Sequence, residues 1–238
     1  MEQSGSPGPH SHRAFRPGPL LTLAACIAFS TSLSWSAADA QPSADQPGLR
    51  QQVIPILATT FDRDRNPVGV VAELQVGLYR RDDQNGVDVQ FQVAPGRFSP
   101  TTQVAVLTAI YHAARVAKLN PDSWTILLEV PHRGVTVYGN SLSAMVGLTV
   151  VALAEGHSIK PSHVVTGTIE RDGRIGAVSG IALKLQAAHA RRLGRVLIPE
   201  EYLVTEGDWS TPFLLHVSPV GSVTRAYRAL TDHDFPGS

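Results

Sequence analysis

Helical and strand patterns alternate through the second half of this 238-residue sequence, and this order restricts the possible folds more than any other feature. Apolar residues recur at helical spacing in three segments, and short runs rich in β-branched residues separate them. We expect a helix at 141–155, a strand at 163–170 ending in a turn at Asp172 and Gly173, a helix at 180–193, a strand at 195–198, a short strand at 213–217 and a helix at 220–230. Such an order is typical of an α/β or α+β domain.

The first half is richer in strands. Val53–Thr60 and Val68–Tyr79 are rich in β-branched residues and flank a polar segment, so they predict two strands joined by a loop. Further patterns predict a strand at 87–93, a helix at 101–118 and a buried strand at 124–130. Apolar residues make up 43% of the chain, which is enough for one domain with its own core, expected over residues 51–235.

The N-terminal part has a different composition. An apolar run from Leu20 to Trp35 ends shortly before Ala38-Asp39-Ala40, which predicts a signal peptide over residues 1–40 and a polar linker over 41–50. The protein would then be periplasmic or secreted. Lipid attachment at Cys26, a retained membrane anchor and a chain that is not exported are the alternatives. Because Cys26 is the only cysteine, the processed chain would have neither a disulfide nor a thiol nucleophile.

The charges argue against two classes of partner. Lys plus Arg number 20 and Asp plus Glu number 20, so the formal net charge is zero. A protein that binds nucleic acid or an anionic membrane surface usually carries a basic patch or a basic excess. We therefore expect neither partner for the domain, and a membrane tether only through the N-terminal segment.

Ser141 begins one of the predicted helices. Asn140 precedes it and is a good N-cap residue, so we expect the Ser141 hydroxyl at the positive end of a helix, where backbone N–H groups can hold an oxyanion. A serine hydroxyl is a weak nucleophile at neutral pH unless a neighbouring base takes its proton. An ordinary capping serine is the structural alternative.

Lys184 lies in the next predicted helix among apolar residues that include Ile181, Leu185 and Ala188. Burial disfavours the ammonium form and lowers the pKa of a lysine, as a general base at neutral pH requires. The alternative is a lysine whose stem covers apolar surface while its amine reaches water.

Five segments together resemble the proteolytic domain of Lon-type proteases, the S16-like peptidases with a serine–lysine dyad. They are Gly139-Asn140-Ser141-Leu142-Ser143, Val165-Thr166-Gly167-Thr168-Ile169, Gly173 to Gly180, Lys184-Leu185-Gln186-Ala187-Ala188, and Val196-Leu197-Ile198-Pro199. They fit the family pattern without a gap from Pro131 to Pro199 when Ser141 is the nucleophile. Choosing Ser143 would require a two-residue deletion before Thr166.

The resemblance implies a mixed sheet with flanking helices and roles for several residues. Ser141 would attack the peptide carbonyl, Lys184 would take its proton, and Thr166 would orient or hydrogen-bond the lysine amine. Asn140 and Leu142 flank the nucleophile as supporting residues. Tyr138, Leu142 and Ser179 depart from the family pattern near the expected substrate contacts. Lon-type domains assemble into rings, so the resemblance also implies a homo-oligomer.

The sequence contains no Gly-x-x-x-x-Gly-Lys-Ser/Thr segment, the phosphate-binding loop of many ATPases. We therefore expect an ATP-independent endopeptidase that cleaves unfolded or loosely structured polypeptides. A catalytically silent Lon-like module that binds peptides or acts as a scaffold is the alternative.

No cofactor or metal is expected. Asp62, Asp64, Asn66 and Glu73 have the spacing of a calcium loop, but Pro67 replaces the glycine that position six requires. A polar hairpin loop explains these residues.

Overall fold

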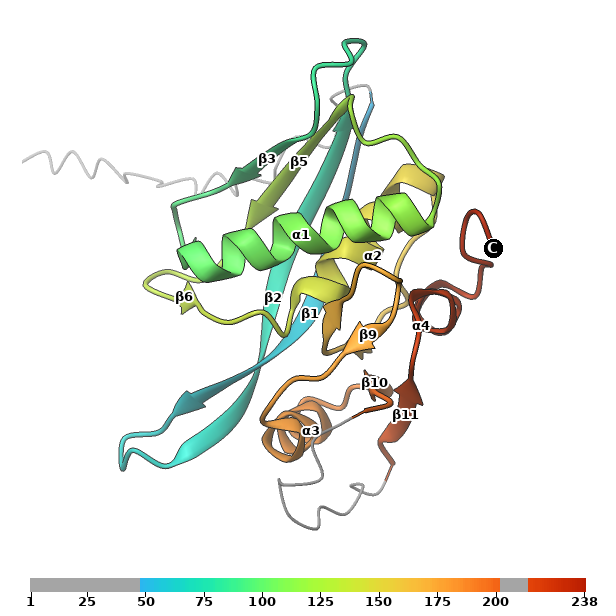
Figure 1. Ribbon diagram of the computed structural model, residues 1–238. Helices are drawn as coiled ribbons and strands as arrows, with labels where there is room; N and C mark the ends of the chain where they lie inside the picture. Colours follow the sequence, from blue (N-terminus) through green and yellow to red (C-terminus); the bar gives the residue numbers. More distant parts are fainter. Residues whose placement is uncertain (1–47, 202–213) are drawn as a thin grey trace, which may run out of the picture. The chain divides into compact units, whose positions relative to one another are not determined.

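Two long antiparallel strands, β1 (Leu49–Phe61) and β2 (Pro67–Arg80), form the predicted hairpin. In the computed structural model of the protein, residues 48–201 and 214–238 are described (Figure 1). The hairpin turn is stabilised by Asp62, whose Oδ1 accepts hydrogen bonds from the amides of Asp64 at 2.9 Å and Asn66 at 2.8 Å. The Asp62 carboxylate thus stabilises the turn through hydrogen bonds to its backbone.

The predicted N-terminal segments fall largely outside the described residues. The signal peptide expected over 1–40, including Cys26, lies there entirely. The strand β1 begins at Leu49, inside the linker predicted for residues 41–50 and two residues before the expected start at Gln51. None of the helices in 48–201 and 214–238 is long and apolar enough to cross a membrane.

The strands form several separate sheets, and the largest of them is mixed, as the resemblance implies. The largest sheet has the order β1-β2-β5-β3, with β5 antiparallel to β2 and β3 parallel to β5. A parallel sheet has the order β11-β10-β7, and β4 with β6 and β8 with β9 form two short pairs. The bounds are β3 (Asp88–Phe91), β4 (Arg97–Phe98), β5 (Trp124–Glu129), β6 (Thr136–Val137), β7 (His163–Val165), β8 (Thr168–Ile169), β9 (Ile175–Gly176), β10 (Arg195–Pro199) and β11 (His216–Val220).

Four helices complete the described fold, and all four were predicted within three residues at each end. They are α1 (Pro100–Val116), α2 (Ser143–Glu155), α3 (Ile181–Ala190) and α4 (Val223–Thr231). The first begins at a capping serine, because the Ser99 hydroxyl accepts a hydrogen bond from the Thr102 amide at 3.2 Å. The second ends at Gly156, whose φ of 77° is the left-handed conformation that glycine favours.

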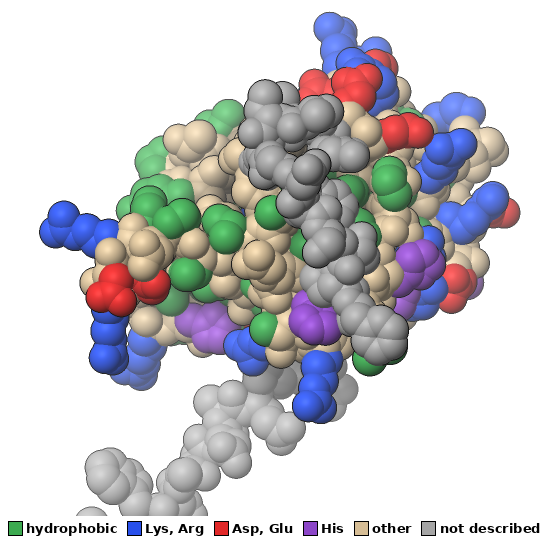
Figure 2. All heavy atoms as spheres, turned by 90° about the horizontal axis from the view of Figure 1, so that it is seen from below, with side chains coloured by type: hydrophobic (Ala, Val, Ile, Leu, Met, Phe, Trp, Pro, Cys, Tyr) green, Lys and Arg blue, Asp and Glu red, His purple; other side chains and the backbone are tan. Residues whose placement is uncertain are grey.

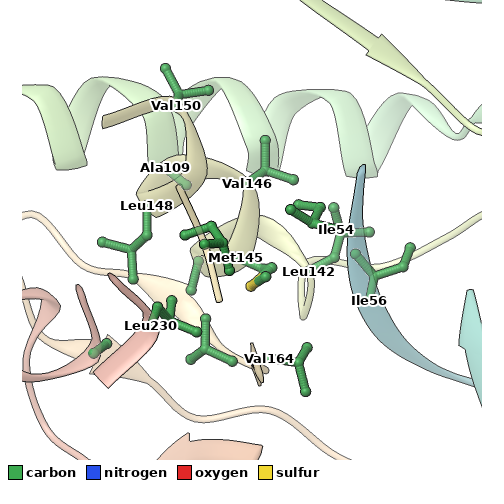
Figure 3. Packing of buried hydrophobic residues seen from close by; sticks show 14 of the residues in the cluster. Ile54, Ile56, Ala109, Leu142, Met145, Val146, Leu148, Val150, Val164 and Leu230 are labelled. Atoms are coloured by element: carbon green, nitrogen blue, oxygen red, sulfur yellow. The ribbon is translucent and has the colours of Figure 1, made fainter. Parts of the chain in front are cut away.

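The core is built around α2, which is apolar on all sides. Every residue of this helix except Glu155 is buried. Figure 3 shows its side chains packed among residues of β1, α1, β7 and α4, including Ile54, Ala109, Val164 and Leu230. Full burial of each large aliphatic side chain contributes about 1.5–3 kcal/mol, so α2 is fixed by packing from several directions.

A close helix crossing holds α2 against α1. A Cβ built at Gly147 would lie 3.0 Å from the carbonyl oxygen of Ala109 and 3.0 Å from Cδ1 of Ile169. These separations are shorter than ordinary van der Waals contacts, so glycine lets the two helices approach each other closely.

The surface carries both signs of charge. On the face shown in Figure 2, basic and acidic side chains are interspersed, mainly around the edge, and neither sign dominates. This distribution agrees with the formal net charge of zero.

Candidate active site

Ser141 lies in a turn that leads from β6 into α2. Gly139 precedes it with a φ of 85°, a backbone conformation that residues with a Cβ rarely adopt. The Ser143 amide then donates to the carbonyl oxygen of Asn140 at 3.0 Å, which closes the turn. The serine side chain is partly exposed, as a nucleophile must be.

The predicted capping role of Asn140 was wrong. The helix α2 begins at Ser143, the cap position is occupied by Leu142, and no side chain makes a capping hydrogen bond there. The amides of Ser143 and Ala144 instead donate to backbone carbonyls of Asn140 and Gly167, at 3.0 and 3.1 Å. Local sequence suggested a side-chain cap, but the carbonyl of Asn140 itself and the distant carbonyl of Gly167 accept these bonds instead.

Thr166 and Gly167 hold the serine turn from the opposite side. The carbonyl oxygen of Ser141 accepts hydrogen bonds from the Gly167 amide at 2.8 Å and from the Thr166 hydroxyl at 3.3 Å. The predicted strand over 163–170 is interrupted at these two residues, because their polar groups bind the serine turn. A Cβ at Gly167 would lie 2.7 Å from Cγ2 of Ile175, so only glycine fits there.

Lys184 lies on α3, with only 3% of its surface exposed. Its Nζ donates a hydrogen bond to the carbonyl oxygen of Ser179 at 2.8 Å. The helix begins after Gly180, whose φ of 71° turns the chain into α3. The expected apolar neighbours Ile181, Leu185 and Ala188 are buried, so the lysine stem lies in the core as predicted.

The hairpin and α3 approach each other closely at two glycines, Gly69 of β2 and Gly180 before α3. The sequence analysis did not single out Gly69. A Cβ built at Gly69 of β2 would lie only 1.9 Å from the carbonyl oxygen of Leu183, the residue before Lys184. A Cβ at Gly180 would lie 2.8 Å from Cγ2 of Thr59 on β1. A glycine inside a predicted strand often marks such a close backbone approach, and Gly69 carried that signal.

Ser141 and Lys184 line one cavity, of about 600 Å³. Its floor is one face of the hairpin, and its opposite wall is formed by residues of the segment from His132 to Ser141. Ser143 is buried in α2 and does not line the cavity, which supports the choice of Ser141 over Ser143. Thr166 is buried behind the serine turn.

The cavity lining is mostly apolar and uncharged. Apart from Lys184, its titratable side chains are His132 and Tyr138, and no described lining residue is an aspartate or glutamate. A pocket with apolar walls and a few convergent polar groups is the usual form of a binding site.

The sequence that forms this site matches a known protein family. The model of the Lon protease (S16) C-terminal proteolytic domain matches residues 99–205, a range that contains Ser141, Thr166 and Lys184. The chain carries a Lon-type proteolytic domain. The match begins at the residue that caps α1 and continues through β10, so it contains the serine and lysine segments but not the hairpin that lines the cavity.

A curated relative agrees with the family match. Lon protease 2 of Desulfotalea psychrophila is 30% identical over 100 residues, which is 41% of this chain. The chain spans only 13% of the length of that protein.

Proposed function

We propose that the protein is a serine endopeptidase in which Ser141 is the nucleophile and Lys184 the general base. The observation that carries this proposal is that both residues line one cavity although they come from different elements. A Lon-type domain with this arrangement has the two groups that peptide hydrolysis through an acyl-enzyme needs.

The chemistry follows from the two side chains. The Lys184 amine takes the proton of the Ser141 hydroxyl as the serine oxygen attacks the scissile carbonyl. The tetrahedral intermediate collapses when the lysine returns this proton to the leaving amine, which breaks the peptide bond. Water, deprotonated in turn by the amine, then hydrolyses the ester and restores both groups.

The surroundings of Lys184 support its role as a base. Burial disfavours the ammonium form, which has no lone pair to accept a proton. The hydrogen bond to the Ser179 carbonyl fixes the position of Nζ at one side of the cavity. A neutral amine retains a lone pair for the serine proton while it donates this bond.

The oxyanion would be held at the serine turn. In the described part of the chain, no backbone hydrogen bond is made by the amides of Ser141 and Leu142, whereas those of Ser143 and Ala144 are occupied. The first two amides precede α2, whose positive end favours a negative charge. We assign the oxyanion to them, in place of the amides within the helix.

The proposed substrates are unfolded or loosely structured polypeptides, cleaved without ATP. The sequence given contains no phosphate-binding loop, and the cavity is lined by groups suited to a peptide rather than to a nucleotide phosphate. A homo-oligomer is part of the proposal because the family resemblance implies one.

The experiment is casein hydrolysis without ATP by the wild type and three variants. Ser141→Ala and Lys184→Met should each lower kcat by at least about 10³-fold. Ser143→Ala is the matched control, because this serine is two residues away but buried in α2. Equal, background-level turnover by the wild type and both site variants contradicts the proposal, and peptide binding without turnover would favour a silent module.

Export through the N-terminal segment is proposed separately. N-terminal sequencing of the protein purified from its natural cell should begin at Gln41 if a signal peptide is removed after Ala40. A lipidated N-terminus at Cys26, abolished in Cys26→Ser, would show lipid attachment instead. An intact Met1 in a cytoplasmic fraction would contradict export.

A further inference from the structure

The floor and the wall of the cavity are held in place by very different means. The floor belongs to the hairpin, in which β1 is paired with β2 along its whole length from Leu49 to Phe61. The opposite wall, from His132 to Ser141, contains β6, which pairs with β4 over two residues. So short a ladder gives little stability of its own, and the wall therefore needs other contacts to keep its distance from the floor.

Such contacts come from the first turn of α1, which lies beside β6 (Figure 1). The Thr102 hydroxyl donates a hydrogen bond to the carbonyl oxygen of Val137 at 3.1 Å, across 35 positions of the sequence. The Ser99 amide donates to the same oxygen at 2.9 Å. Both lone pairs of the Val137 carbonyl are therefore occupied by groups at the start of one helix.

The two hydroxyl groups form a chain with a fixed direction. Ser99 Oγ and Thr102 Oγ1 lie 2.9 Å apart, and the Thr102 amide donates to Ser99 Oγ at 3.2 Å. Each hydroxyl has one proton, and that of Thr102 is used on the Val137 carbonyl. The Ser99 hydroxyl therefore donates to Thr102 Oγ1. Because linked hydrogen bonds polarise one another, losing either hydroxyl weakens the bond to the wall.

The chain connects the wall to the core of the domain. Thr102 is fully buried, and Ser99 is only 6% exposed, so water does not compete for these bonds. Phe98, the last residue of β4, is also buried in the core. Val137 lines the cavity, and Ser141 follows it four residues later in the same wall. A bond at the Val137 carbonyl thus fixes the segment that leads to the proposed nucleophile.

We propose that Thr102 is a positioning residue that fixes this wall and thereby determines how strongly the site discriminates between substrate side chains of different size. The long hairpin fixes the floor, so the position of the wall sets the width available to a side chain bound between them. A site of fixed width favours the side chain that fills it. This inference rests on the proposed peptidase function and concerns the selectivity of the same site.

The test compares substrates that differ only in the size of one side chain. Quenched fluorescent decapeptides carry alanine, leucine or tryptophan on the N-terminal side of the cleaved bond, which mass spectrometry identifies. Thr102→Val removes the hydroxyl and keeps the shape of the side chain, and Thr102→Ser returns the hydroxyl. Thr149→Val is the matched control, because this buried threonine donates to the Met145 carbonyl within α2 at 2.7 Å.

The wild type should discriminate at least about tenfold in kcat/KM between the best and the worst decapeptide. Thr102→Val should reduce this ratio at least about threefold, whereas Thr149→Val should leave it within about twofold of the wild type. Thr102→Ser should restore the ratio.

A wild type without discrimination, an unchanged ratio in Thr102→Val, a uniform loss on all three decapeptides, or no restoration by Thr102→Ser would overturn the inference. Each of these outcomes leaves the peptidase proposal standing. If the wild type cleaves none of the decapeptides, the peptidase proposal itself fails, and the inference fails with it.

A second measurement follows the wall directly and needs no catalysis. The Ser99 amide bonds the Val137 carbonyl, so its hydrogen exchange reports how often the wall separates from β4. In Thr102→Val this exchange should be at least about threefold faster than in the wild type and in Thr149→Val. Ser99→Ala removes the other hydroxyl of the chain and replaces Thr102→Val in both measurements if that variant folds poorly. Unchanged exchange contradicts the inference.

Discussion

The serine and the lysine are held in the site by different means. The serine turn leads into α2, whose residues other than Glu155 are buried, and its carbonyl is bonded by Thr166 and Gly167. The helix α3, in contrast, buries Ile181, Lys184, Leu185 and Ala188, and it rests on the hairpin at Gly69.

Because of this difference, substitutions on the two sides should affect stability and activity to different extents. A change in the core beneath the serine turn should lower the free energy of unfolding while leaving the activity of each folded molecule largely unchanged. A change at the hairpin contact can displace α3 by about 1 Å and should affect activity first. Misplacement of a reacting group by about 1 Å can lower the rate about 10²-fold.

Gly69→Ala is expected to have the largest effect, because the added Cβ would lie 1.9 Å from the Leu183 carbonyl oxygen. The helix must move, and kcat should fall about 10²-fold. Gly77→Ala in the same strand is the control, since its Cβ would meet side-chain atoms at an ordinary 3.5 Å. Equal activity of the two variants would show that the glycine contact does not position Lys184.

Gly147→Val tests the serine side through the core. The added side chain crowds the carbonyl of Ala109 at the α1–α2 crossing, and we expect the free energy of unfolding to fall by about 1–3 kcal/mol. Urea denaturation measures this loss. Activity per folded molecule should remain within about threefold of the wild type, and a large loss without destabilisation would invalidate the contrast.

Thr166→Val removes the hydroxyl that donates to Ser141 at 3.3 Å but preserves the shape of the side chain. Because one hydrogen bond contributes about 0.5–1.5 kcal/mol, kcat should fall roughly two- to tenfold while KM changes little. Thr166→Ser should restore the rate, since it returns the hydroxyl. Failure of this rescue would argue that the methyl group, rather than the bond, positions the turn.

Asp62→Asn, at the distant hairpin turn, should have the smallest effect. The backbone hydrogen bond from Asn66, with further hydrogen bonds from the Asn66 side chain and the Asp64 amide, lowers the pKa of Asp62. The carboxylate therefore stabilises the fold above the pKa of the unfolded chain, about 3.9, and this contribution disappears as the pH falls through the lower folded pKa. Tm should drop slightly at pH 7, and the difference from the wild type should shrink as the pH falls below about 3.9; a constant difference would contradict the ionic origin.

The long elements could be predicted from sequence because their signals are local. Helical spacing in α1 and α2, and β-branched runs on both sides of a polar loop in the hairpin, are properties of neighbouring residues. The short pairs β4–β6 and β8–β9 were not predicted, since two residues give no periodic signal and their partners come from elsewhere in the chain. The expected cap at Asn140 was wrong because the Ser143 amide bonds the Asn140 carbonyl and the Ala144 amide bonds the distant Gly167 carbonyl.

By itself, the sequence determined the order of the long elements and the Lon-type motifs, and it predicted Ser141 rather than Ser143 as the nucleophile. This was possible because motif spacing and apolar periodicity are properties of the sequence itself. Only the tertiary structure showed that Gly69 lets α3 approach the hairpin and that Thr166 bonds the serine turn. These relations depend on packing between segments distant in sequence, where contact geometry rather than local preference decides the outcome.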